Sequence, residues 1–398
     1  MCFKDQVNEK LTWVKKKVKS YNFAQWLVII GVLSLLLPDY NYTYYMLSVL
    51  SSLVLLRKQS RQRVFSHPVI KYIALLFPIF TFPALVSQNW LGLMEGWIFW
   101  YGLIFVCHIF SVMTTKFYND IIDLMLCMSI FNAVIAFIQA FLFHSSRAAS
   151  TFGHPNYYAS AIEVFIFTAF YRYSKTKKKM YLWCILINVF ALILTNCRSA
   201  WLALAAAIMF YVVYYVRKVT AVLKTAAALA VVFAIIFIFM PRIDSGDLST
   251  SSDVRAAIWL TAWQWIGKNP LIGYGLAFFM TIYPGTNLGL TPHAHNIIFN
   301  TILDYGVIGF IGFCVLFGKY YKVLIRNSSY NADYDRIAKL IISLSVCFLA
   351  HGVTDAILTV AHMYILTFII LSGAFVEKNE RYNKKLPSIP AKKSIINL

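Results

Sequence analysis

The chain has 398 residues, of which 60% are hydrophobic and only 13% are charged, and its mean hydropathy is +0.66. Soluble domains carry about a quarter charged residues, so this composition excludes an ordinary soluble enzyme and favours a protein solvated by lipid. The net charge of +20 would suit a nucleic-acid-binding protein, but the Lys and Arg residues stand in short clusters between apolar segments. We therefore expect membrane lipids, and no nucleic acid, among its partners.

Apolar segments of helical length follow one another along almost the whole chain. They lie at 24–38, 42–56, 69–86, 97–113, 121–143, 157–172, 181–195, 199–216, 221–240, 296–317, 337–357 and 360–376. Because an apolar helix of about 20 residues crosses a bilayer, we predict an all-α, polytopic membrane protein with about twelve transmembrane helices. No small-residue cleavage pattern precedes the first segment, so we expect no cleavable signal peptide.

The links between these segments alternate in charge. Every second link is rich in Lys and Arg, beginning with the N-terminal segment and ending with the tail beyond Lys378. Positively charged links stay in the cytoplasm, so both termini should be cytoplasmic and one large loop should be external. The predicted parts are 1–240 with about nine helices, the external loop 241–295, and 296–398 with about three helices and a basic cytoplasmic tail.

The external loop is long and has a mixed composition, which is typical of a structured loop. A helix-like stretch at 254–266 carries three tryptophans, as in an amphipathic helix at a membrane interface, and Asp253 is predicted to cap its start. The sequence NPLIGYG at 269–275 predicts a turn after this helix. In the segment that follows the loop, the spaced glycines that begin with Gly306 predict close packing between helices.

Cationic residues are scarce on the predicted outer side, where nearly all of them are Arg147, Arg198, Arg242, Arg255 and Lys268. Two of these arginines stand out. Arg198 lies in a very short link, so it should sit near membrane depth, where an arginine favours an anionic partner such as phosphate. The alternative is an arginine that reaches the lipid headgroups or pairs with a loop carboxylate. Arg255 falls near the start of the predicted loop helix, where free N–H groups also favour an anion, although a local pair with Asp253 is equally consistent.

The histidines His293 and His295 directly precede the segment at 296–317. Two histidines are too few for a zinc site, and the third ligand is not identified by spacing. Other outer groups that could converge with them are His144, His154, His351, His362 and Asp355. A catalytic imidazole is the second interpretation, because a helix N-terminus favours the neutral form that accepts a proton. Two histidines bonded to the loop backbone are the third.

Four short motifs follow one another between residues 151 and 312. They are TFGHPN at 151–156, TNCRSAW at 195–201, Arg255 with NPLIGYG at 269–275, and PHAHN at 292–296 followed by DYGVIG at 304–309. Their order and spacing resemble the O-antigen ligase and O-antigen polymerase superfamily of bacterial surface-polysaccharide enzymes. The second motif departs from the family pattern at Cys197, where a serine is usual.

The resemblance implies a metal-independent, inverting glycosyltransferase that needs no cofactor. Its donor would be a glycan on undecaprenyl diphosphate, its acceptor lipid A–core or another glycan, and its location the bacterial inner (plasma) membrane, with the site on the periplasmic or external face. By motif position, Arg198 and Arg255 would bind the donor diphosphate and act in catalysis with His295, which would activate the acceptor hydroxyl. Supporting positions would be His293, Asn296 and Asn156.

The reaction type remains open within this resemblance. The single large loop and the HN motif favour O-antigen ligase, whereas O-antigen, capsule or exopolysaccharide polymerases and protein O-oligosaccharyltransferases share the same motifs. A transporter of lipid-linked glycans is the alternative from another class of protein. It would predict paired charges deep within the spans and an internal repeat, but only Asp355 and Glu163 suit the first, and we find no repeat.

Overall fold

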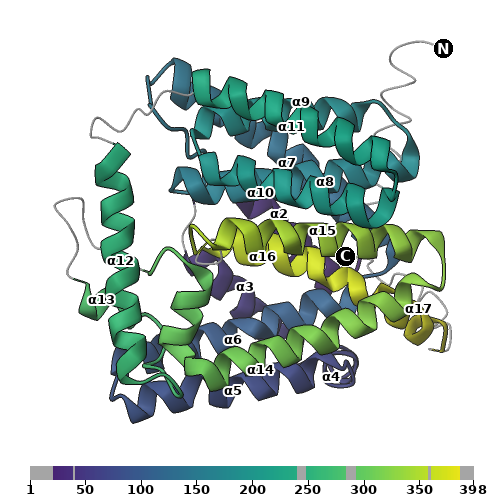
Figure 1. Ribbon diagram of the computed structural model, residues 1–398. Helices are drawn as coiled ribbons and strands as arrows, with labels where there is room; N and C mark the ends of the chain where they lie inside the picture. The colour runs from purple at the N-terminus through teal and green to yellow at the C-terminus, as the bar shows by residue number, and fades with distance from the viewer. Residues whose placement is uncertain (1–20, 39–40, 240–247, 284–292, 357–359, 386–398) are drawn as a thin grey trace, which may run out of the picture.

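The computed structural model describes residues 21–38, 41–239, 248–283, 293–356 and 360–385 (Figure 1). Each of the twelve predicted apolar segments overlaps a helix, and the last residues of the segments 221–240 and 337–357 lie outside the described residues. The elements are α2 (Phe23–Leu33), η1 (Ser34–Leu36), α3 (Asn41–Val54), α4 (Lys58–Phe65), α5 (Val69–Val86), α6 (Trp90–Val112), α7 (Thr115–Phe141), α8 (Pro155–Thr176), α9 (Met180–Thr195), α10 (Arg198–Tyr211), η2 (Val212–Val216), α11 (Val219–Phe239), α12 (Leu248–Lys268), α13 (Phe279–Ile282), α14 (Ile297–Ser328), α15 (Ala332–Gly352), α16 (Ala361–Leu371), η3 (Ser372–Phe375) and α17 (Val376–Lys385).

The long helices run side by side, and α12 stands across one end of them (Figure 1). Helix α15 occupies a central place, because it packs against α8, α10 and α14. Helix α12 packs mainly against α14, the helix that follows the loop. Residues distant in sequence can therefore lie close together at the ends of four helices, α8, α10, α14 and α15.

The helices have the length and surface of membrane spans. Among the described residues, seven helices are long and apolar enough to cross a bilayer, at Val69–Val86, Trp90–Val112, Thr115–Phe141, Arg198–Val216, Val219–Ile236, Ile297–Ser328 and Ala361–Arg381. Shorter apolar helices lie at Phe23–Leu36 and Met180–Thr195. Only 6% of the Val219–Ile236 stretch is buried within the protein, so its apolar side chains face outward. Such a surface suits lipid. The protein is an all-helical membrane protein, while the count of twelve spans remains a prediction.

Helix α14 is interrupted at Gly306, whose φ of 64° and ψ of −179° are not helical. The loop 269–275 inserts its backbone at this break. Val307 N–H donates to the carbonyl of Pro270 over 2.8 Å, and Gly275 N–H donates to the carbonyl of Asp304 over 2.7 Å. Backbone groups freed inside a membrane protein must find such partners, because lipid offers none.

This break changes the interpretation of Gly306, whereas Gly309 and Gly312 approach Ile79 of α5, as predicted for packing between helices. A Cβ atom at Gly306 would lie 2.1 Å from the carbonyl oxygen of Leu271, and one at Gly273 would lie 2.4 Å from the nitrogen of Gly306. The closest approach at Gly306 is therefore between the helix and the loop 269–275, whereas the sequence predicted packing between helices. The same contacts fix the end of α12 to α14.

Replacing Gly306 with alanine is expected to detach the loop 269–275 from α14. The backbone conformation of Gly306 is one that only glycine adopts readily, and the strain alone costs about 1–3 kcal/mol. We expect a lower thermal unfolding midpoint and faster trypsin cleavage after Lys268. Gly318→Ala is the matched control in the same helix, because a Cβ there meets nothing within 4 Å. Equal cleavage of both variants would contradict this account of the break.

Candidate active site

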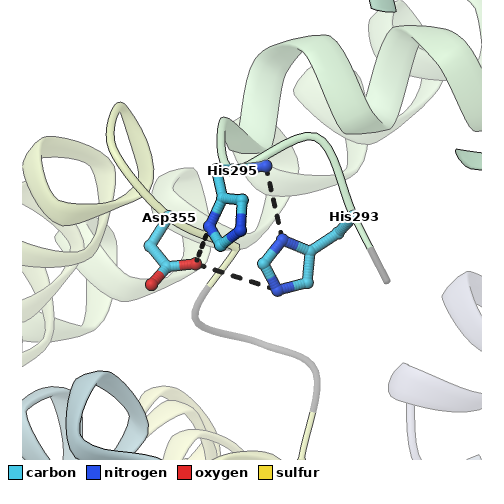
Figure 2. A group of neighbouring side chains, drawn as sticks. All are labelled: His293, His295 and Asp355. Atoms are coloured by element: carbon cyan, nitrogen blue, oxygen red, sulfur yellow. Dashed lines mark hydrogen bonds and ion pairs between the residues drawn. The ribbon is translucent and has the colours of Figure 1, made fainter. Parts of the chain in front are cut away.

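His295 and Asp355 face each other between the start of α14 and the end of α15 (Figure 2). His295 Nδ1 lies 3.1 Å from Asp355 Oδ1. The next residue, Asn296, caps α14 by accepting the N–H groups of Ile298 and Phe299, and His295 itself has a positive φ of 47°. The cap and this turn set the direction of the imidazole. The His295 side chain is 26% exposed, whereas that of Asp355 is only 2% exposed.

Asp355 is held as a carboxylate. Burial alone would raise its pKa, but the hydrogen bond with His295, the nearby imidazoles and the Asn156 amide together hold the pKa well below its usual range. Asn156 Nδ2 donates to Asp355 Oδ2 over 2.7 Å, and Ala356 N–H donates to Oδ1 over 2.8 Å. An ionised Asp355 keeps the proton of His295 on Nδ1. In the neutral form of this partly exposed ring, Nε2 is then the nitrogen that can accept a proton.

His293 supports this pair from one side (Figure 2). Its Nδ1 accepts the backbone N–H of His295 over 3.3 Å, and its Nε2 lies 3.8 Å from Asp355 Oδ1 and 3.3 Å from the hydroxyl of Tyr157. Burial lowers the pKa of His293 to about 4, so the ring is neutral at physiological pH. The supporting role of His293 stays a prediction.

The same three groups have the spacing of a metal site. The ligand atoms of His293, His295 and Asp355 all lie within 4.8 Å of one another. However, His293 Nδ1 accepts an N–H, so in the neutral ring Nε2 carries the proton and is not a ligand. Metal binding at His293 Nε2 would need the proton on Nδ1, where it would meet the His295 N–H. The arrangement therefore favours a hydrogen-bonded group over a metal centre.

Arg147 joins this group to the segment that carries Arg198. Its Nη2 donates to Asn156 Oδ1 over 2.7 Å, and its Nε donates to the carbonyl of Thr195 over 3.2 Å. Thr195 ends α9, and Arg198 begins α10. A continuous chain of bonds therefore runs from the link before Arg198 through Arg147 and Asn156 to Asp355. The sequence identified Arg147 only as one of the scarce outer cations and assigned it no role.

The helix that carries Arg255 packs on the loop that carries the two histidines. Ile258, one turn after Arg255, belongs to the same buried cluster as Ala294, which lies between the two histidines. The guanidinium of Arg255 takes no part in the network of bonds recorded among the described residues. The structure thus connects Arg198's segment to His295 by hydrogen bonds and docks Arg255's helix on the same loop, and the roles of both arginines remain predictions.

The start of the Arg255 helix differs from the prediction. Helix α12 begins at Leu248, so Asp253 lies inside the helix and does not cap it. Arg255 lies beyond the first turn, where the backbone N–H groups already have helical partners. An anion at Arg255 would therefore be bound by the guanidinium and not by free N–H groups. The stretch before Val254 is rich in serine, which resembles a cap in sequence but is helical here.

The sequence identified Asp355 as one of several outer groups that could converge with the histidines, and as one of two deep charges that suit a transporter. The pairing with His295 joins residues sixty positions apart, and no local pattern specifies it. Asn156 was assigned a supporting role from its motif, and the structure gives it two partners, Asp355 and Arg147. The signal that identified Arg147 and Asp355 in the sequence was the rarity of charge on the predicted outer side.

The fold and this polar group define an all-helical membrane protein with a histidine–carboxylate site at the ends of its helices. Residues 183–314 match the family model described as O-Antigen ligase, and this match confirms the resemblance found in the sequence motifs. Members of this family are glycosyltransferase-like enzymes whose partners are lipid-linked glycans and glycan acceptors. No curated protein matches this sequence.

The matched region contains Arg198, Arg255 and His295, but it ends before Asp355 and begins after Asn156. The structure brings these last two residues to the matched region through the hydrogen bonds described above. The candidate site is therefore built both from the family domain and from helices on either side of it.

Proposed function

We propose that this protein is an O-antigen ligase, which transfers a glycan from undecaprenyl diphosphate to a sugar hydroxyl of lipid A–core at the outer face of the bacterial inner membrane. The observation that carries the proposal is the Asp355–His295 pair, because it leaves a basic Nε2 on a partly exposed ring. The proposal includes about twelve spans, both termini in the cytoplasm, and the division into 1–240, the external loop 241–295 and 296–398.

In the proposed reaction, His295 Nε2 accepts the proton of the acceptor hydroxyl as its oxygen attacks the anomeric carbon. The bond from that carbon to the diphosphate oxygen breaks, and the electron pair leaves with undecaprenyl diphosphate. Arg198 and Arg255 stabilise the charge that develops on this leaving group, as preorganised cations do in other transfers. A single displacement of this kind inverts the anomeric carbon and requires no metal ion.

Glu163 is one of the two deep charges that the transporter alternative would use, and its carboxylate is bonded to His351 over 2.7 Å. A buried pair of this kind is what that alternative predicts, whereas the internal repeat that it also predicts is not found in the sequence. Formation of a glycosidic bond is therefore the property that separates an enzyme from a transporter of lipid-linked glycans.

The test is a transfer assay with the purified full chain in lipid nanodiscs. A defined glycan on undecaprenyl diphosphate is supplied with lipid A–core, with a second lipid-linked glycan, or with a protein acceptor, and products are identified by mass spectrometry. We expect a new glycosidic bond to lipid A–core, of inverted configuration, that forms equally in the presence of a chelator. Product only with the second glycan would make the protein a polymerase, and product only with protein an O-oligosaccharyltransferase. No product with any acceptor would contradict the proposed chemistry.

A further inference from the structure

A second polar group lies deeper than the His295 site, where α8, α10 and α15 meet. Glu163 Oε1 lies 2.7 Å from His351 Nδ1, and His351 Nε2 lies 3.1 Å from Ser199 Oγ. The side chains of Glu163 and His351 are completely buried, whereas Ser199 is partly exposed. The three groups therefore form a line that begins in the protein interior and ends at the surface of the site.

The side chain and the backbone of His351 each contact a segment of the candidate site. Its imidazole reaches Ser199, which directly follows Arg198 in the first turn of α10. Its backbone carbonyl accepts the N–H groups of Thr354 and Asp355 over 2.9 and 3.1 Å. One buried residue thus contacts both the turn that carries Arg198 and the turn that carries the partner of His295.

The contacts of Ser199 limit the directions open to its hydroxyl. A carboxylate only accepts hydrogen bonds, so the short contact with Glu163 keeps a proton on His351 Nδ1. In the ion-paired form, His351 also carries a proton on Nε2, and this N–H donates to Ser199 Oγ. The hydroxyl hydrogen of Ser199 then points away from His351, either toward Cys197 Sγ, which lies 3.2 Å from Ser199 Oγ, or toward an anionic oxygen that takes its place.

We propose that Ser199 is a further donor-binding residue, whose hydroxyl donates to the phosphate beside Arg198, and that Glu163 and His351 are the positioning residues that orient it. This inference rests on the proposed function, because the anion is the diphosphate of the lipid-linked donor. The site also offers the N–H groups of the first turn of α10, which lack helical partners and favour an anion.

The test measures binding of undecaprenyl diphosphate itself to the full chain in nanodiscs, with uncharged undecaprenol as the comparison probe. Ser199→Ala is expected to weaken undecaprenyl diphosphate binding by about tenfold to a hundredfold, the range for one lost hydrogen bond to a charged group. Binding of undecaprenol should not change. Ser199→Thr keeps a hydroxyl and should restore most of the affinity.

A double variant tests whether His351 acts through Ser199. His351→Gln should weaken binding in the same direction, and the double variant with Ser199→Ala should be little worse than the single ones, because both remove the same interaction. In transfer assays, both should raise KM for the donor and leave KM for the acceptor unchanged. Ser174→Ala is the matched control and should bind undecaprenyl diphosphate as the wild type does, since its hydroxyl lies in α8 like Glu163 but bonds to the carbonyl of Tyr171.

Each outcome decides the inference. Unchanged affinity in Ser199→Ala would overturn it. Complete loss of transfer with normal binding would also overturn it, since this would make Ser199 a nucleophile whose hydroxyl donates to a neutral His351. Affinity that depends on Ser199 in a protein that forms no glycosidic bond would uphold this inference while the proposed function fails. A wild-type chain that does not distinguish undecaprenyl diphosphate from undecaprenol would overturn both.

Discussion

Replacing His295 with alanine is expected to lower kcat for glycan transfer by about 10²- to 10⁴-fold, the range for a lost general base. The variant should still bind undecaprenyl diphosphate, because the proposed diphosphate-binding groups belong to other elements. Initial rates with saturating donor and acceptor measure the effect. Its physical basis is the unprotonated Nε2 that the bond between Nδ1 and Asp355 maintains.

Asp355→Asn should give a smaller loss, about 10- to 1,000-fold, because the imidazole remains and only its tautomer and orientation are disturbed. One oxygen of Asp355 accepts from Asn156 and the other from Ala356 N–H and His295. A new amide cannot accept at both ends, so it either loses Asn156 or presents its NH₂ group to His295 Nδ1. The second arrangement moves the imidazole proton to Nε2, where it blocks proton transfer.

Asp335→Asn is the control for the loss of one carboxylate, because Asp335 pairs with Lys339 at the other end of α15. It should transfer glycan at the wild-type rate. Normal rates in His295→Ala would remove the imidazole from the mechanism. Equal losses in Asp335→Asn and Asp355→Asn would indicate a general effect on folding.

The helices were predictable because the bilayer imposes a simple rule: a span must be apolar over its whole length, so the apolar segments define the elements. The beginning of α12 was not predictable in this way. That helix lies outside the apolar segments, and serine and Asp253 before Val254 suit either a cap or a helical turn. Packing of α12 on α14 is a property of the whole fold and decides between them.

The site was predictable only in part for a similar reason. Motifs identify His295, Asn156 and Arg198 separately, but their connection depends on Asp355 and Arg147, which belong to no motif. Gly306 shows the same limit. Its spacing from later glycines suggests helix packing, whereas its positive φ, which allows the loop to enter, depends on contacts with residues more than thirty positions earlier.

Replacing Arg198 with alanine is expected to reduce kcat/KM for the donor by about 10²- to 10³-fold, as for other groups that stabilise charge in a transition state. Arg198→Lys should recover only part of this loss. A lysine supplies the charge, but it lacks the planar fork that binds two phosphate oxygens together. The comparison therefore measures how much of the effect depends on geometry and how much on charge.

Arg255→Ala provides the decisive comparison, because Arg255 is docked through α12 and takes no part in the recorded bonds that join Arg198's segment to Asp355. If both guanidinium groups bind one diphosphate, each single variant should weaken binding of undecaprenyl diphosphate. Raising the salt concentration should then weaken binding by the wild type more than binding by either variant.

Arg217→Ala is the control, since this exposed arginine bonds to the carbonyl of Tyr214 at the opposite end of the helix that Arg198 begins. Wild-type affinity in Arg255→Ala would leave Arg198 as the sole arginine at the diphosphate, and the charge of the leaving group would then have to be met chiefly by Arg198 and the first turn of α10.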